Sequence, residues 1–538
     1  MRRVIFVCFA AILSQWAVTA QAAPNACARP SIGNIVPVIS ELRSTRGQLR
    51  VDLALRTATD PFGLVLYCYI ASNGDQAPTL RVKPGDEVAL GLKNDLPPAD
   101  ASPNGHNHSA SCSGGAMTEH STNLHFHGLN VPPTCHQDEV IHTLIQPSQE
   151  PFEYRIHIPV TQTPGLYWYH PHPHGFSEAQ VLGGASGALI VEGIEEIRPE
   201  VAGLPERVLI LRDQRVPGLG EANEDAGPGK DVSLNFVPIM YPLYRPAEMP
   251  VKPGRREFWR VLNASADTYF DLQLLFGSTI QDLHSPQPLR LIAIDGAPIN
   301  PAAPEHISTP SHVLLTPGGR AEFVVTTPPV GVIGQFVTRK YDTGPFGTAT
   351  PYRALANIRP GVDAPSAPSA IPELAAPRPQ QSFKALAGIA PAGQRKLYFS
   401  ETGTDPADTT AIPSYFITVD GAEPKVFSMD FKQADITVRQ GTVEDWIIEN
   451  RAREAHSFHI HQLHFQVLER NGVAAPEPML RDTIDVPYWD GQSPTYPSVK
   501  LRMDFRDPNI VGTFLFHCHI LEHEDKGMMG TITVEPSR

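Results

Sequence analysis

The stretch GTFLFHCHILEHEDKGMMG, residues 512–530, places a cysteine between two histidines close to the C-terminus. Side chains alternate between the two faces of a β-strand, so Cys518 would point away from both His517 and His519. If this run is a strand, the tripeptide can contact one metal ion through its thiolate and a second metal site through its imidazoles. It would then link the two sites covalently.

Cys518 has further candidate ligands. His523 and Met528 lie five and ten residues after it, and His456 belongs to another histidine-rich run. Two imidazoles, a thiolate and a weak axial thioether form the ligand set of a blue copper centre. Zinc also binds one cysteine with two histidines, and Cys518 could be a structural thiol or half of a disulfide. These alternatives do not account for the flanking histidines and the methionine, so copper is the preferred interpretation.

Histidines separated by one residue recur in pairs along the chain. Such residues project from the same face of a strand with Cα atoms roughly 6.5 Å apart, so both imidazoles can reach one metal or two adjacent metals. A single pair is weak support, but eight imidazoles exceed what one ion binds and suit a cluster of about three ions with open positions. The pairs are His125 with His127, His170 with His172, His459 with His461, and His517 with His519.

An internal repeat predicts three homologous β domains. In three strand-like runs, a turn glycine is followed nine residues later by asparagine, and each unit closes with a glycine-led run of aromatic or branched residues. The first runs are Gly85 to Asn94, Gly254 to Asn263 and Gly441 to Asn450, and the closing runs start at Gly165, Gly334 and Gly512.

The repeat also indicates which histidines belong together. In the first and third units, a histidine pair stands five and seven residues after the glycine of the closing run. The middle unit has Arg339 and Tyr341 at those positions, so it keeps the repeat pattern but lacks the candidate ligands. His174 and His464 fall just outside the pairs and are not expected to be ligands. The histidines without a motif are expected to be ordinary polar or surface residues: His136, His142 and His157.

Length and composition limit the class of protein. The chain of 538 residues is long enough for about three domains. Its 54 prolines and 41 glycines, with little helical periodicity, favour short strands joined by turns, and hence an all-β protein. A formal charge of −14 without a concentrated Lys/Arg stripe argues against nucleic acid or an anionic membrane as partner.

The N-terminus shows a basic, apolar and then small-residue pattern that is typical of a cleaved export signal over residues 1–22. Its arginine pair would fit the twin-arginine route, and a general secretory signal fits as well. No later segment approaches the roughly 18 apolar residues of a membrane span, so a periplasmic or extracellular protein is expected. We predict domains over 23–200, 201–359 and 383–538, with a Pro/Ala-rich linker over 360–382.

Four further cysteines could form disulfides, and one inserted loop contains further histidines. Cys27, Cys68, Cys112 and Cys135 are enough for two disulfides in an oxidising compartment, and the sequence does not choose among the three pairings. Residues 102–121 form a Gly/Ser/His/Asn-rich insertion, which we interpret as a solvated loop. Its histidines could bind a metal instead, and they are His106, His108 and His120.

Four motifs resemble those of the multicopper oxidases, in particular the three-domain laccase-like group from bacteria. They are H-x-H-G, W-Y-H-x-H, H-x-x-H-x-H and H-C-H-x-x-x-H-x-x-x-G-M, and the match covers nearly the whole mature chain. The resemblance implies three cupredoxin-like Greek-key β-sandwich domains and four copper ions per chain. A type 1 copper would lie in the last domain, and a trinuclear cluster of one type 2 and two type 3 ions between the first and last.

The resemblance also assigns the ligands and the reaction. Type 1 ligands are His456, Cys518, His523 and Met528; type 2 ligands are His125 and His459; type 3 ligands are His127, His170, His172, His461, His517 and His519. The implied reaction is one-electron oxidation of a small reducing substrate near the type 1 copper, coupled to four-electron reduction of dioxygen to water at the cluster. The exposed edge of His523 or His456 would accept each electron.

Dioxygen reduction consumes protons, so carboxylates should lie close to the cluster. Asp138 resembles an acid that the family places beside the cluster, and Glu524 resembles its proton donor. The family usually has glycine after that aspartate, whereas this chain has Glu139, which competes with Asp138 for the role. Glu524 could instead be a solvated charge in an acidic turn.

The natural reducing substrate is not specified by these motifs. Phenols and aromatic amines suit a shallow apolar site, while cuprous or ferrous ions need methionine or carboxylate ligands. With nine methionines and no Met-rich insertion, a laccase-like enzyme is preferred over a metal-ion oxidase of copper or iron homeostasis. A non-enzymatic copper carrier would need only the type 1 ligands. A monomer is expected.

Overall fold

The structure, a computed structural model, describes residues 27–98, 112–147, 149–217, 230–361, 386, 389–404 and 413–537. The predicted export signal, nearly all of the predicted linker, and His106 and His108 of the predicted loop lie outside these residues.

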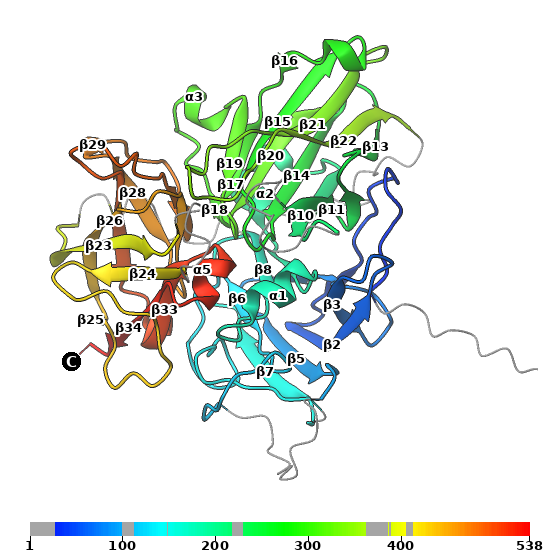
Figure 1. Cartoon of the computed structure of the whole chain (residues 1–538). Coiled ribbons are helices and arrows are strands. Elements are labelled where there is room, and N and C mark those ends of the chain that lie inside the picture. Colours follow the sequence, from blue (N-terminus) through cyan, green and yellow to red (C-terminus); the bar gives the residue numbers. More distant parts are fainter. Residues whose placement is uncertain are drawn as a thin grey trace, which may run out of the picture.

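The described residues form an all-β fold of six sheets, arranged as three sandwiches of two sheets each. We call them the first, middle and third sandwich, with strands within residues 41–191, 206–360 and 393–535. Figure 1 shows the middle sandwich in green above the other two, and the third, in yellow to red, beside the first. The predicted fold of three cupredoxin-like sandwiches is confirmed, whereas the predicted domain boundaries stay predictions.

The strands follow in sheet order. The first sandwich contains β1 (Glu41–Arg43), β4 (Thr79–Val82), β9 (Gly187–Val191), β8 (Gly165–His170) and β6 (His125–His127), packed on β3 (Val65–Ala71), β2 (Gln48–Thr59), β5 (Glu87–Asn94) and β7 (Phe152–His157). The middle sandwich contains β12 (Val237–Ile239), β11 (Asp231–Leu234), β10 (Glu206–Gln214), β14 (Arg256–Asn263), β20 (Arg320–Thr326), β17 (Arg290–Ile294) and β18 (Ala297–Pro298), packed on β13 (Ala247–Val251), β22 (Arg353–Pro360), β21 (Ile333–Arg339), β15 (Phe270–Gly277), β16 (Ser285–Pro286) and β19 (His312–Leu315).

The third sandwich contains β24 (Ser414–Val419), β23 (Gly393–Thr402), β26 (Thr442–Asn450), β32 (Ser498–Phe505), β28 (Phe465–Arg470), β29 (Val473–Ala474) and β30 (Leu480–Arg481), packed on β25 (Ile436–Arg439), β34 (Met529–Glu535), β33 (Gly512–Cys518), β27 (His456–Ile460) and β31 (Thr483–Val486). The helices are short: α1 (Ser177–Leu182), α2 (Ile194–Ile197), α3 (Glu305–Ser308) and α5 (Leu521–Asp525), with 3₁₀ turns η1 (Pro199–Val201), η3 (Ile280–Asp282) and η4 (Pro508–Ile510).

The repeated glycine-to-asparagine runs are β5, β14 and β26, and each pairs in parallel with the first long strand of its sheet. Five residues after the turn glycine, each run buries a large side chain in its own core: Leu90, Trp259 and Trp446.

The closing asparagine explains why the repeat ends as it does. The amide nitrogen of Asn450 donates to the carbonyls of Glu454 and Val486, while its oxygen accepts from the backbone N–H of Ala452. Asn94 and Asn263 make the equivalent contacts in the other sandwiches. A buried amide thus satisfies the backbone where the chain leaves the sheet.

The first and third sandwiches meet where α1 contacts α5, close to the centre of Figure 1. Leu521 of α5 packs there with Val181 and Leu182 of α1 and with Ala266 of the middle sandwich. The disulfides are Cys27–Cys68 and Cys112–Cys135, one of the three possible pairings. Within the described residues, no helix has the length and apolar character needed to cross a bilayer.

Candidate metal centre

Strand pairing brings the histidine pairs into register. β6 runs antiparallel to β8 with His125 opposite His170, and β27 runs antiparallel to β33 with His459 opposite His517. All eight paired histidines are buried. Rings of the two sandwiches stack on each other, so the predicted pairs from the two ends of the chain meet.

The eight histidines form one group across the boundary between the first and third sandwiches. The ring of His125 stacks on that of His461, and the ring of His127 stacks on that of His459, each with 3.9 Å between centroids. Nε2 of His461 lies 3.1 Å from Nε2 of His517. Several sets of three donors within this group lie close enough to share one metal ion.

One ring nitrogen of most of these histidines is held by a protein acceptor. Nδ1 of His125 binds the Asp138 carboxylate at 3.0 Å, and Nε2 of His127 lies 3.2 Å from the Asp482 carboxylate. Backbone carbonyls hold Nδ1 of three others: His459, His170 and His517. Metal-binding histidines characteristically donate their second N–H to such acceptors.

The opposite nitrogens are buried without a hydrogen-bond partner among the described residues. They are Nε2 of His125, His170, His172 and His459, Nδ1 of His127 and His461, and both nitrogens of His519. Buried polar atoms are normally satisfied, so this concentration of orphaned nitrogens is the property expected of a metal site. Burial lowers the pKa of His170 to about 3 and that of His172 to about 4, so both imidazoles are neutral at pH 7.

A second group joins His456, Cys518 and His523. The Cys518 Sγ atom lies 3.6 Å from Nδ1 of His456 and 3.7 Å from Nδ1 of His523, and the two nitrogens are 3.2 Å apart. Nitrogens bound at about 2.0 Å and sulfur bound at about 2.3 Å to one ion would be separated by about 3.3 and 3.5–3.7 Å. The observed spacing therefore fits one metal ion, and the ligand types are those of a blue copper centre.

Met528 is fully buried in the same core cluster as Cys518. Its backbone N–H donates to the His523 carbonyl at 2.9 Å, and its carbonyl accepts from the Cys518 N–H at 3.1 Å. Helix α5 and the turn after it thus bring the methionine back beside the cysteine.

Of the two competing acids, Asp138 contacts the histidine group and Glu139 does not. Besides His125, Asp138 accepts from the backbone N–H of Phe126 and from the Gln462 amide. Burial raises the pKa of Asp138 well above its usual range, although these hydrogen bonds oppose the shift. The Glu139 carboxylate instead binds His142 and Thr143.

Glu524 is completely buried, so the solvated-charge interpretation is wrong. One carboxylate oxygen lies 3.1 Å from Nδ1 of His517 and the other lies 3.6 Å from Nε2 of His172, and neither has a well-aligned hydrogen bond. Burial acts to raise the pKa of Glu524, but the imidazoles of His172 and His517 outweigh it and lower that pKa to about 2. The carboxylate bridges histidines of the first and third sandwiches.

Two residues beside the histidine group had no signal in the sequence. Asp482 precedes β31 and faces His127, and Arg320 begins β20 of the middle sandwich and contacts Asp482. They lie 162 residues apart in the chain and belong to no motif, so only the fold brings them together. Gly318 also lies at the group, since a Cβ there would be 2.9 Å from Nε2 of His519.

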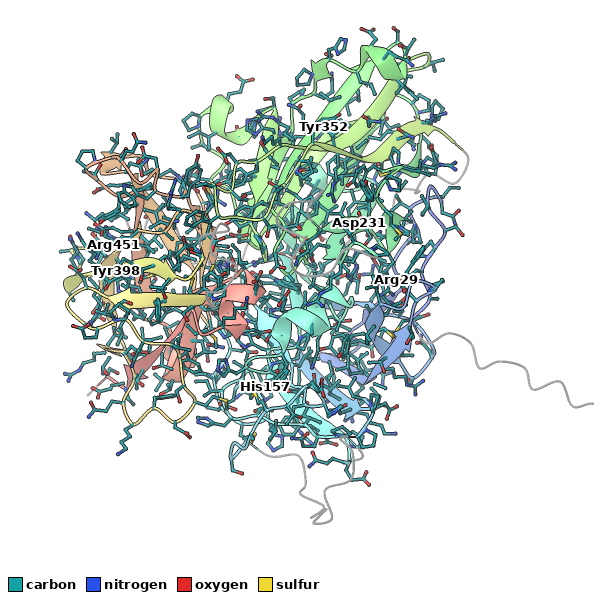
Figure 2. All side chains as sticks on the ribbon, in the orientation of Figure 1. Arg29, His157, Asp231, Tyr352, Tyr398 and Arg451 are labelled. Atoms are coloured by element: carbon teal, nitrogen blue, oxygen red, sulfur yellow. A yellow bond between two sulfur atoms is a disulfide. The ribbon has the colours of Figure 1, made fainter. Side chains whose placement is uncertain are left out.

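Five further described histidines that the sequence analysis named lie outside both groups. His174 packs on Phe427, and His464 binds the Asp295 carbonyl at 2.9 Å. His157, labelled in Figure 2, ends β7 and is mostly exposed beside Glu87. His136 stacks on Phe152 and His142 binds Glu139.

The two groups are joined by the tripeptide His517–Cys518–His519. The cysteine belongs to one group and both flanking histidines to the other, as strand alternation in β33 requires. Such an arrangement can pass electrons between a thiolate-bound metal and a many-histidine cluster with open positions.

Two family models described as multicopper oxidase match residues 116–196 and 397–538. The chain is 25% identical over 471 residues to the multicopper oxidase mco of Staphylococcus haemolyticus, which covers 85% of this chain and 81% of the relative. It is 26% identical over 440 residues to a laccase of Haloferax volcanii, covering 78% and 68% of the two chains.

The fold is similar to a solved structure from Campylobacter jejuni, described as a multicopper oxidase and a metallo-oxidase. The TM-score is 0.68 at 23% identity, covering 94% of this chain and 96% of that chain. The two segments that match the family models contain both histidine groups.

Proposed function

The chain belongs to the multicopper oxidase family of copper oxidoreductases, and from this premise we propose that it is a laccase-like oxidase of phenols or aromatic amines with dioxygen as acceptor. The observation that carries the proposal is the linkage of a His₂Cys group to an eight-histidine group through one tripeptide. A copper carrier would need only the His₂Cys group and not the eight-histidine group.

We assign four copper ions to these donors. His456, Cys518 and His523, with Met528 as the weak fourth ligand, would hold the type 1 ion, and the eight paired histidines would hold the other three. Copper bound there supplies one-electron oxidation of the donor and four-electron reduction of dioxygen to water. Both groups are buried, so bulk water is excluded from their nitrogen and sulfur atoms.

Two buried carboxylates have different roles in this proposal. The Glu524 carboxylate, which is ionised at pH 7, would accept a proton transiently and pass it on beside His172 and His517. Asp138 holds the N–H at Nδ1 of His125, which leaves Nε2 directed toward the other histidines. It thus acts by orienting His125.

The reducing substrate would give its electrons near His523. His523 and His456 are both buried, so the predicted exposed edge is wrong. Tyr415 stacks on the His523 imidazole at 4.1 Å and gives this site an aromatic neighbour, which suits a phenol or aromatic amine. The other ring nitrogen, Nε2, lies 3.0 Å from the Glu454 carboxylate. A second carboxyl group, Glu401, interacts with Glu454, and burial together with this neighbour raises the pKa of Glu401 to about 8.

These carboxyl groups favour one rival function, the oxidation of ferrous ions, because cuprous ions prefer sulfur ligands. Hard cations bind carboxylate oxygen, and Glu454 lies directly beside the ring that would accept the electron. Oxygen uptake by the copper-loaded protein with a phenol, Fe(II) or Cu(I) as donor separates the two functions. We expect the phenol to support the fastest uptake; uptake with metal ions alone would favour the rival, and no uptake with any donor a carrier.

Neutralising Glu454 should affect the two donor classes differently. In Glu454→Gln, we expect ferrous-ion oxidation to fall by about tenfold, because a carboxylate worth roughly 1.4 kcal/mol to a cation is lost. Phenol oxidation should stay within about threefold, because a neutral donor gains little from the charge. Steady-state oxygen uptake with each donor measures the ratio.

The matched control is Asp420→Asn, which removes an exposed carboxylate of the same sandwich that pairs with Arg451. It should leave both rates unchanged. An equal loss for both donors in Glu454→Gln would show that this carboxylate supports His523 without selecting the donor.

Export to the periplasm or beyond is also part of the proposal. The signal pattern of residues 1–22 and the two disulfides support an oxidising compartment.

A further inference from the structure

One buried junction joins all three sandwiches beside the histidine group. Arg320 of the middle sandwich donates to both carboxylate oxygens of Asp482 of the third sandwich, at 2.6 Å each. The Oδ1 atom of Asp482 lies 3.2 Å from Nε2 of His127 of the first sandwich. All three side chains are completely buried.

The arginine is fixed from several directions. Its backbone N–H donates to the Asp295 carboxylate at 2.9 Å, its Nε–H donates to the Leu166 carbonyl, and Nη1 donates to the Gly318 carbonyl. A planar guanidinium that forms two parallel hydrogen bonds sets the plane of the carboxylate as well as neutralising its charge. Asp482 therefore has one orientation, and that orientation meets His127.

Two glycines make room for this contact. A Cβ on Gly128, which has φ of +87°, would lie 2.5 Å from Nη2 of Arg320 and 2.6 Å from Oδ2 of Asp482. A Cβ on Gly318 would lie 3.1 Å from Cε1 of His127. The glycine of the H-x-H-G motif thus admits the ion pair directly behind the second histidine.

The His127 ring needs this acceptor because it is turned the opposite way from His125. In His125 the Nδ1 atom is held by Asp138 and Nε2 is orphaned, whereas in His127 the Nε2 atom faces Asp482 and Nδ1 is orphaned. The backbone carbonyl of Asp482 also accepts from Nδ1 of His459 at 2.8 Å. One residue thus holds two stacked histidines, one from each sandwich.

Asp482 could in principle bind a metal itself, since its carboxylate lies near His127 and His459. The guanidinium of Arg320 occupies both oxygens of that carboxylate and places a positive charge there. A cation would be repelled from this side, so the carboxylate acts behind the histidines.

We propose that Asp482 and Arg320 are positioning residues for copper binding by His127 and His459, so that the middle sandwich, which has no ligands, helps to set the geometry of the cluster. This inference rests on the proposed function, because it requires copper at those histidines. His464, which lies 3.5 Å from Asp482, completes the junction without being a ligand.

The test compares copper-loaded wild type with the double variant Arg320→Met/Asp482→Leu and the single variant Arg320→Lys. Replacing a buried ion pair with apolar residues of similar size is often neutral for stability, so the double variant should unfold near the wild-type temperature. Its cluster copper should bind about 10- to 100-fold more weakly in competition with a chelator, as for lost supporting hydrogen bonds. The electron paramagnetic resonance of the cluster should change, while the blue absorption of the Cys518 site persists. Arg320→Lys keeps the positive charge but cannot form two parallel hydrogen bonds with Asp482. It should give a loss of copper affinity between those of the wild type and the double variant.

Arg207→Met is the control, since Arg207 is partly buried, pairs with Glu257 in the same sandwich, and donates hydrogen bonds to Glu257 and Pro250. It should lower thermal stability without changing cluster affinity or spectrum. If the double and lysine variants keep wild-type cluster affinity and spectrum, the positioning role is wrong. If wild type itself retains only the blue copper, the proposed function fails instead.

Discussion

Replacing Cys518 with serine is expected to abolish the intense blue absorption and to reduce turnover to the uncatalysed background. The thiolate is the one sulfur anion in the group with His456 and His523, and a neutral hydroxyl is a poor copper ligand. The side chain is buried and the substitution nearly conserves volume, so the fold should remain. Absorption, oxygen uptake and thermal unfolding of the copper-loaded variant measure these three effects.

Met529→Leu is a matched control for the loss of a sulfur atom close to this site. Met529 packs in a separate apolar cluster with Phe427 and Leu515, so its replacement should keep both the colour and the turnover. Phenol oxidation by the serine variant at the wild-type rate would show that electrons do not pass through Cys518.

Glu524→Gln is expected to lower turnover by about 100-fold or more, the usual contribution of a positioned proton-transfer group. The amide keeps the size of the side chain between His172 and His517 but cannot carry a proton. Bleaching of the blue absorption by a phenol under argon should proceed at the wild-type rate, because the Glu524 carboxylate faces His172 and His517 of the other group. Recovery of the colour on admitting oxygen should be slow, which stopped-flow absorption measures.

Glu522→Gln is the companion variant, because Glu522 lies on the same helix and pairs with Lys526. Both phases should match wild type. If Glu524→Gln also turns over at the wild-type rate, the buried carboxylate has no part in proton delivery.

Local rules were sufficient to predict much of the fold. A glycine that opens a strand and an asparagine that closes it occur three times, because each sandwich needs the same buried amide where its chain leaves the sheet. Alternation along β33 was enough to place Cys518 on the opposite face from His517 and His519, because successive side chains of a strand point to opposite faces of the sheet.

Contacts between sandwiches could not be predicted in this way. The ion pair of Arg320 with Asp482 joins distant strands, and no spacing rule connects them. The orientation of the His127 ring depends on that pair and was equally hidden. Asp138 and Glu139 are adjacent in sequence, and only the course of the loop shows that Asp138 points toward the histidines.

The disulfide pairing was undetermined because it depends on tertiary contacts within the first sandwich. Three pairings satisfy the sequence, whereas the folded chain places Cys27 beside Cys68 and Cys112 beside Cys135. The burial of Glu524 could not be predicted either. The acidic turn around it is compatible with exposure, but α5 packs against α1 and Glu524 is buried.

Donors from the first and third sandwiches should together bind four copper ions. Elemental analysis of the purified, copper-loaded protein, quantified against protein concentration, tests this most directly. We expect four copper atoms per chain and no zinc. Zinc in place of copper, or a single metal atom per chain, would contradict the account.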